Sequence, residues 1–327
     1  MKKIFALFLS LSLALSLFGC GNAAPAEPTE APEATQSEAE AKVLKLLVIG
    51  NSHSNDAFWQ LYEVFKAQAP EQEVVVGILY YSGCDITQHV QFGKTRARVY
   101  DYYRNGSGTW EHLAETDMQY ALQDQAWDII LLQPSRPAAE YEKETRDALA
   151  AIVAENVKEP YDLYLHKSWA NPSDPELWSD THDPVPPSGY WDSLIRIYGT
   201  VDPVNQTNMM NEQIKTKMLG DEMFTKFIST GAAIMHAHLV SGVPQVDLWR
   251  DYTHLTDYGR LIASYALYTQ ITGDSVTEVK VESIAANLRH RRAQVLGDME
   301  VTPEMKQVIL DAVKYAQENP WTTPGQS

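Results

Sequence analysis

Apolar runs with the length of strands alternate with segments of helical period along this chain. The first run, Val43–Ile49, is interrupted only by Lys45, as expected for a strand that is covered on both faces in a parallel sheet. After a small polar turn at 50–54 the period changes, and apolar side chains recur at helical spacing at Phe58, Leu61, Tyr62 and Phe65. The pattern therefore predicts a buried strand, a turn and a helix in succession.

Three more runs have the length and composition of strands: Glu73–Tyr81, Trp127–Pro134 and Tyr161–Trp169. The helix that begins near Ser54 lies between the strands Val43–Ile49 and Glu73–Tyr81, so these two strands form a βαβ unit and should be parallel. Helical patterns are also present at Trp110–Gln125, at Tyr141–Val157 and at Tyr258–Thr272, where Gly273 ends the helix. This alternation predicts an α/β fold around a parallel sheet.

The amino terminus has the features of a secretory signal, with two lysines followed by an apolar stretch, Ile4–Phe18. Leu17-Phe18-Gly19-Cys20 resembles a bacterial lipobox, which predicts residues 1–20 as a lipoprotein signal peptide and Cys20 as the lipidated residue. Cleavage by an ordinary signal peptidase and an uncleaved anchor are the alternatives. Residues 21–41 contain no large apolar side chain, so we expect a disordered acidic tether.

The remaining chain is long enough for one α/β domain at 42–275, with a Pro- and aromatic-rich insertion at about 171–220, and a helical carboxy-terminal extension at 276–327. The net charge of −17 argues against nucleic acid or anionic polymers as the main ligand, but it leaves neutral sugars open. With a lipid on Cys20, the protein is expected in the bacterial cell envelope, anchored on the outer face of the cytoplasmic membrane.

Residues with catalytic side chains or free backbone donors follow several of the expected strands. Ser52, Gly83, Gln133 and His254 each stand at a junction after a strand, and such junctions open on one edge of a parallel sheet. Asp251 precedes His254 by three positions. A serine nucleophile needs a base, a carboxylate that orients the base, and donors for the oxyanion, and these residues offer all three.

In these blocks the sequence resembles the SGNH (GDSL-type) hydrolase superfamily, and in particular its DUF4886-type bacterial branch. Gly50-Asn51-Ser52 is similar to the first block, Ser82-Gly83-Cys84 to the second, and Asp251-Tyr252-Thr253-His254 to the last. The resemblance extends over Val43–Thr272. It implies a flavodoxin-like three-layer α/β/α sandwich with a central parallel sheet, a Ser52–His254–Asp251 triad, and oxyanion donors from Ser52 and Gly83.

The sequence departs from the superfamily pattern in two blocks. Asn51 replaces the usual aspartate of the first block, and Leu132-Gln133-Pro134-Ser135-Arg136 stands where the third block normally supplies an asparagine. Gln133 is the expected third oxyanion donor, because its side-chain amide can donate as the asparagine does, and Arg136 is the alternative donor. Substrate contacts are expected from Asn51, His53, Arg136 and Trp169.

Other reactive side chains in the sequence offer weaker candidate sites. His236 and His238 would share one face of a strand, but no acidic residue accompanies them at metal-ligand spacing, so no metal site is predicted. Cys84 has no neighbouring cation to activate its thiol. His53 adjoins Ser52, but adjacent residues on a turn usually point apart, which favours His254 as the base.

The sequence thus predicts a surface-anchored serine esterase, without cofactor, that removes acetyl or other short acyl groups from carbohydrate or another small ester. A non-catalytic lipoprotein that binds glycan or another solute through a degenerate site is the alternative, and an acyltransferase that uses the same serine also stays open. The expected partners are the ester substrate and the membrane, with no role for nucleic acid.

Overall fold

A computed structural model describes residues 42–134, 142–172, 188–286 and 297–326 of the protein. Its centre is a seven-stranded sheet in the order β4-β3-β2-β1-β5-β6-β7. The strands are β1 (Leu44–Gly50), β2 (Val74–Tyr80), β3 (Tyr100–Asn105), β4 (Glu111–Thr116), β5 (Ile129–Leu132), β6 (Asp162–Lys167) and β7 (Lys226–Ser229). Five neighbouring strands are parallel: β2, β1, β5, β6 and β7. Numbered by their order in the chain, they follow the flavodoxin-like succession 2-1-3-4-5.

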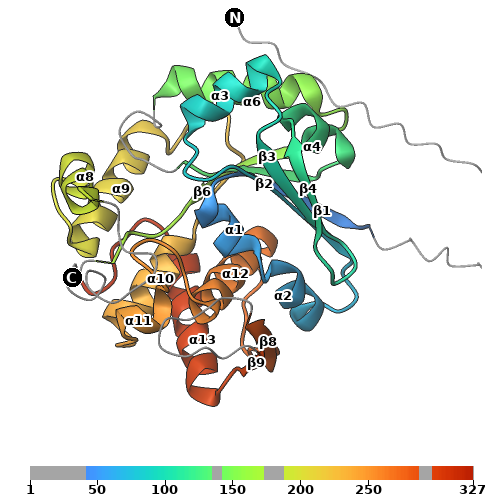
Figure 1. The fold of residues 1–327 in the computed structure, drawn as a ribbon. Helices are drawn as coiled ribbons and strands as arrows, with labels where there is room; N and C mark the ends of the chain where they lie inside the picture. Colours follow the sequence, from blue (N-terminus) through green and yellow to red (C-terminus); the bar gives the residue numbers. More distant parts are fainter. Residues whose placement is uncertain (1–41, 135–141, 173–187, 287–296, 327) are drawn as a thin grey trace, which may run out of the picture. The chain divides into compact units, whose positions relative to one another are not determined.

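Helices cover both faces of the sheet, as Figure 1 shows. One face carries α1 (Ser52–Phe58), α2 (Leu61–Gln68), α10 (Thr230–Leu239), α12 (Asp257–Thr272) and α13 (Pro303–Glu318), and the other carries α3 (Ile86–Thr95), α4 (Met118–Asp124) and α6 (Lys143–Asn156). Alternate side chains of β1 enter the two cores, with Leu46 and Val48 on one side and Leu47 and Ile49 on the other. The predicted three-layer α/β/α sandwich is confirmed.

The central helix of the first layer is α12, which is buried along its length from Asp257 to Ile271. The Thr256 side chain caps its start by accepting a hydrogen bond from the Gly259 N–H, and Gly273 ends it at a φ of 81°. These bounds agree with the helix predicted at Tyr258–Thr272.

Two segments differ from the expected secondary structure. The helical pattern assigned to Trp110–Gln125 was wrong over Glu111–Thr116, which forms β4 and pairs antiparallel with β3 at the edge of the sheet. Most side chains of β4 are exposed, so no buried face marked it as a strand. His236 and His238 lie on α10 and not on a strand, because the Ser229 side chain caps a helix there by accepting from the Ala232 N–H.

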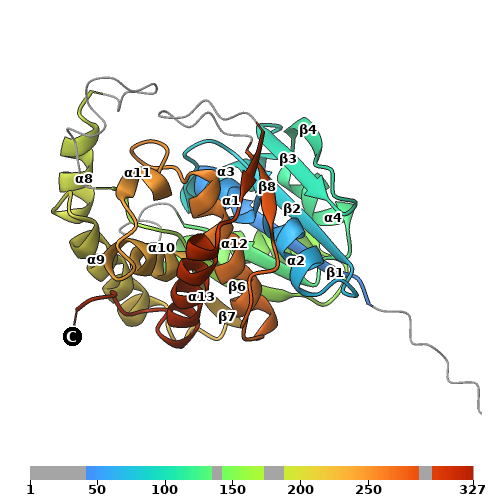
Figure 2. The ribbon, with the colours of Figure 1, turned by 90° about the horizontal axis from the view of Figure 1, so that it is seen from below.

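The carboxy-terminal residues complete the same core. An antiparallel pair, β8 (Ser283–Ala286) and β9 (Gly297–Glu300), precedes α13, which lies beside α10 and α12 (Figure 2). The buried side chains of these three helices belong to one apolar cluster. At the end of the sheet nearest α10 lie α8 (Tyr190–Tyr198), α9 (Pro203–Lys217) and α11 (Gln245–Leu248). None of the helices in the described ranges combines the length and apolar composition needed to cross a bilayer.

Gln270 of α12 makes hydrogen bonds to the backbone at the end of β7, and its replacement tests the fold. Its side chain accepts a hydrogen bond from the Ser229 N–H at 2.9 Å and donates to the Ser229 carbonyl at 3.2 Å, in a buried setting. Gln270→Ala should lower the free energy of unfolding by about 1–3 kcal/mol because it leaves buried polar groups without partners. Urea unfolding checks this. Gln307→Ala, on the exposed face of α13, is the matched control, and equal stability of the two variants would contradict the assignment.

Candidate active site

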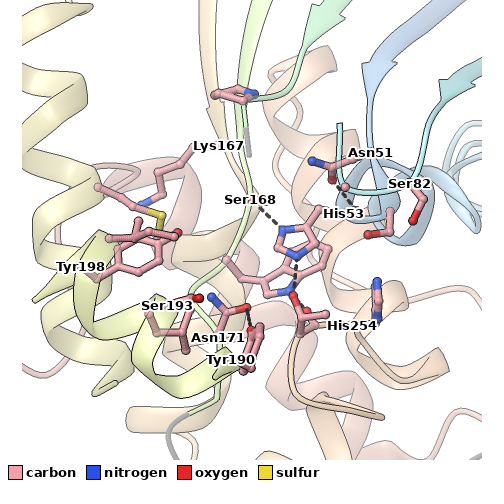
Figure 3. A pocket seen from close by; sticks show the side chains of 18 of the residues that line it. Asn51, His53, Ser82, Lys167, Ser168, Asn171, Tyr190, Ser193, Tyr198 and His254 are labelled. Carbon is pink, nitrogen blue, oxygen red and sulfur yellow. Dashed lines mark hydrogen bonds between the residues drawn. The ribbon is translucent and has the colours of Figure 1, made fainter. Parts of the chain in front are cut away.

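A cavity of about 380 Å³ opens at the carboxyl ends of β1, β2 and β6. Its volume lies in the range of small-molecule sites, and its position is where open α/β sheets bind ligands. Side chains from α8 and α9, including Leu194 and Met210, close the opposite wall, and Figure 3 shows the polar groups that face inward. The walls bring together several of the predicted site residues: Asn51, Ser52, His53, Gly83, Trp169 and His254.

Ser52 is the first residue of α1, directly after the turn that ends β1. Gly50 is required in this turn, because a Cβ there would lie 2.2 Å from the Ser54 hydroxyl oxygen and 2.8 Å from Oε1 of Gln133. Among the described residues the Ser52 hydroxyl has no hydrogen-bond partner. The hydroxyl is therefore available at the start of a helix, where backbone N–H groups favour negative charge.

Asn51 is buried and holds this turn in place. Its Oδ1 accepts from the His53 N–H at 3.0 Å, and its Nδ2 donates to the Cys84 carbonyl at 3.0 Å. An aspartate would lack the second bond, since a carboxylate only accepts. The amide therefore joins the turn before Ser52 to the turn that contains Gly83.

Asp251 and His254 form a hydrogen-bonded pair. The two side chains are joined between His254 Nδ1 and Asp251 Oδ2 at 2.8 Å, and Asp251 Oδ1 accepts from the N–H groups of Thr253 and His254. Burial alone would raise the pKa of Asp251, but the hydrogen bond and charge of His254 and these N–H groups lower it. An ionised Asp251 fixes the proton on Nδ1, which leaves Nε2 of His254 as an acceptor.

Ser52 and His254 line the same cavity, although about two hundred positions separate them in the chain. No hydrogen bond joins their side chains in the described part of the structure. Bonds between a nucleophile and its base are often long before substrate binds, so shared placement in the cavity wall is the relevant geometry.

Gly83 presents its backbone to the cavity with a φ of 62°, and a Cβ built at this position would meet no atom within 4 Å. The positive φ explains the glycine, because other residues adopt this conformation at a cost. The N–H groups of Ser52 and Gly83 have no hydrogen-bond partner within the described segments, so both are available to an oxyanion.

The structure does not bring Gln133 into the cavity wall. Its Oε1 accepts from the Asn51 N–H at 3.2 Å and from the Ser54 hydroxyl at 2.9 Å, and its Nε2 donates to the Pro134 carbonyl at 2.6 Å. The side chain is buried, and these bonds occupy both ends of the amide. Gln133 thus supports the turn of Ser52 from β5, in place of the predicted contact with the oxyanion.

His53 lies in the cavity wall with both ring nitrogens engaged. Nδ1 lies 2.9 Å from the Ser168 hydroxyl and Nε2 lies 3.0 Å from the Thr253 hydroxyl, so neither nitrogen is left for Ser52 (Figure 3). Its ring stacks on Trp169 at 4.6 Å, and Trp169 Nε1 donates to the Thr253 carbonyl. Burial first, and then the charge of His254, lower the pKa of His53 to about 4. His53 and Trp169 together hold the residue that precedes His254.

Arg136 and Cys20 lie outside the described residues. Several cavity residues, in contrast, were not singled out from the sequence: Lys167, Ser168, Asn171, Tyr190, Ser193 and Tyr198. The sequence contained one indication that Lys167 is a site residue, because this lysine interrupts the apolar run that forms β6. Within the ranges that the structure covers, no group of three or more His, Cys, Asp or Glu side chains is arranged to hold a metal ion.

Asp56, on α1, is the main link between the two halves of the candidate triad. Arg260 Nε donates to its Oδ1 at 2.8 Å, Arg250 Nη1 lies 3.0 Å from the same oxygen, and the Leu255 N–H donates to Oδ2 at 2.8 Å. The carboxylate is 1% exposed. Its partners lie on α12 and on the loop that carries Asp251, so Asp56 fixes that loop against the helix of Ser52.

Comparison with known proteins supports the family resemblance. The family model described as a domain of unknown function (DUF4886) matches residues 45–186. A crystal structure of a DUF4886 family protein from Bacteroides uniformis ATCC 8492 is 21% identical, with a TM-score of 0.66 over 86% of this chain and 97% of that chain. Residues 45–186 of the chain are therefore similar to the DUF4886 family, and the chain shares the fold of the Bacteroides protein.

A gut microbial diltiazem-metabolizing enzyme, BT4096, is 12% identical, with a TM-score of 0.35 over 72% of this chain and 48% of that one. A similarity of this size does not indicate a common function. No curated protein matches the chain. The predicted DUF4886 resemblance is confirmed, and membership of the SGNH superfamily stays a prediction.

The buried charge of Asp56 generates a test of how the site is held. Burial raises its pKa, but Arg260, Arg250, His254 and the Leu255 N–H together lower it to about 2. The pKa of Asp56 in the folded protein lies below the ordinary value of 3.8, so its ionisation contributes about 2 kcal/mol to the free energy of unfolding above pH 4. This contribution is lost as the pH falls from about 4 to about 2.

Asp56→Asn should lower the free energy of unfolding by about 3–5 kcal/mol at pH 7, because two guanidinium groups lose their carboxylate. The loss of stability that the protonation of Asp56 causes between pH 4 and pH 2 should be absent in this variant. Denaturant unfolding across this range measures both effects, with Asp311→Asn on the exposed face of α13 as control. An Asp56→Asn variant with the stability and pH profile of the wild type would refute the assignment.

Proposed function

We propose that the protein is a serine hydrolase that removes acetyl or other short acyl groups from carbohydrate or another small ester. The observation that carries the proposal is the Asp251–His254 hydrogen bond beside a cavity whose wall also contains the Ser52 hydroxyl, which no described residue engages. Nucleophile, base and orienting carboxylate are the parts that ester hydrolysis by a serine requires.

In this proposal Ser52 Oγ attacks the ester carbonyl while His254 Nε2 accepts its proton. The N–H groups of Ser52 and Gly83 stabilise the oxyanion of the tetrahedral intermediate. His254 then returns the proton to the departing alcohol, which leaves the acyl group on Ser52. A water molecule, deprotonated by the same imidazole, hydrolyses the acyl-enzyme and restores the serine. Asp251 keeps the imidazole in the required tautomer through both steps.

The cavity supports a small substrate. Its volume of about 380 Å³ suits an acylated monosaccharide or a short ester, and its lining combines apolar side chains such as Leu194 and Met210 with hydroxyl and amide groups. Trp169 also lines the cavity, but it is stacked on His53 and buried, so little of its surface is left for contact with a substrate.

The proposed location is the outer face of the cytoplasmic membrane. The lipobox-like Leu17-Phe18-Gly19-Cys20 would attach a lipid to Cys20, and residues 21–41 would serve as the tether. Such an anchor would place the site beside envelope glycans and solutes.

Replacement of the nucleophile tests the proposal. Ser52→Ala should reduce the turnover of p-nitrophenyl acetate by about 10⁴–10⁶ and abolish labelling by a fluorophosphonate probe, because it removes the proposed nucleophile. Ser241→Ala, in a groove beside α13, should keep both activities. Retained hydrolysis in Ser52→Ala would reject the triad, and a wild-type protein that the probe leaves unlabelled would favour a binding function.

Asp251→Asn tests the role of the carboxylate. An amide at this position can stabilise the wrong imidazole tautomer, so kcat should fall by about 10⁴, as in other serine hydrolases, with little change in KM. Steady-state kinetics measures the effect, and Asp298→Asn on β9 provides an exposed carboxylate as control. A kcat within tenfold of the wild-type value would exclude Asp251 from the mechanism.

A further inference from the structure

Lys167 ends β6 and contributes to the wall of the candidate active-site cavity (Figure 3). Only 2% of the residue is exposed. Its ammonium donates a hydrogen bond to Oδ1 of Asn211 on α9, and it lies 5.9 Å from the ring centre of Trp321. One hydrogen bond leaves two of its three protons without an acceptor in the described structure.

The other deeply buried cations of the described residues have carboxylate partners. Arg146 pairs with Asp221 at 2.7 Å, and Arg260 pairs with Asp56. No aspartate or glutamate in the described segments lies within ion-pair distance of Lys167. A buried ammonium without a counter-charge is unfavourable, and such groups are usually paired. The cavity wall therefore holds a cation for which the described residues supply no anion.

The pKa of Lys167 also fits a buried amine that lacks a counter-charge. Burial, and then the charge of Lys215, lower the pKa of Lys167 to about 7. A bound anion would raise the pKa of Lys167 again, because it favours the charged form of the amine. Binding should then be coupled to proton uptake by the protein near neutral pH.

We propose that Lys167 binds a carboxylate of the substrate, so that the cavity accepts esters of acidic sugars or of similar monoanionic alcohols. The inference rests on the proposed function for its ester chemistry, since Ser52 and Lys167 line one cavity of about 380 Å³. A carboxylate fits better than a polyanion, because the net charge of −17 repels multiply charged ligands. A buried cation acts at short range, where salt screens it little.

Ligand binding to the Ser52→Ala protein tests this without turnover. The probes are methyl β-D-glucuronide and methyl β-D-glucoside, which share the sugar ring and differ in the carboxylate. At pH 6, isothermal titration calorimetry should show at least tenfold tighter binding of the glucuronide. Lys167→Met in the same background should abolish the preference. Lys215→Met removes an exposed charge from the same region and should preserve it.

The pH dependence gives a second measurement that needs no change at Lys167. Affinity for the glucuronide should fall between pH 6 and pH 8 as the ammonium deprotonates, while affinity for the glucoside should stay constant. Equal affinities for the two sugars, failure of the glucuronide to bind, or a preference that survives Lys167→Met would overturn the proposal. Since these readouts do not involve hydrolysis, they stay valid if Ser52 is not the nucleophile.

Discussion

The buried carboxylate of Asp56 is the interaction on which the arrangement of this site depends. It lies on the helix that begins with Ser52, and it binds Arg260 of α12 together with Arg250 and the Leu255 N–H. The last two belong to the loop that contains Asp251 and His254. Because a buried charge that loses its partner is costly, the loop cannot move away from α1 without a large loss of stability. One ionic cluster thus brings together segments that lie about two hundred positions apart.

Two further sets of polar contacts define the position of the reactive groups within this frame. Gln133 and Asn51 hold the turn before Ser52 from the side of β5 and β2, and His53 holds Thr253 against β6. These contacts are buried or partly buried, and each uses both ends of a side chain. A site whose groups are fixed in this way needs little reorganisation when charge develops on an oxyanion.

The sequence predicted those parts that depend on local pattern. The apolar run of β1, interrupted only by Lys45, and the periodic, capped helix α12 were predicted with nearly correct bounds, because each has a strong signal of its own. The exposed edge strand β4 has no apolar face and was taken for a helix. Gln133 stood at the expected strand end, but the direction of its amide depends on contacts with Ser54 and Asn51 that no linear pattern contains. Lys167 was missed for the same reason, since its burial comes from α9.

The central claim is that Ser52 and His254 act on one bound ester, and the structure of the protein after reaction with a small fluorophosphonate tests it most directly. The account predicts phosphorus bonded to Ser52 Oγ, a phosphoryl oxygen about 3 Å from the N–H groups of Ser52 and Gly83, and His254 Nε2 beside the modified serine. Modification at another residue, or a phosphonyl group on Ser52 whose oxygen points away from Gly83 and His254, would contradict it.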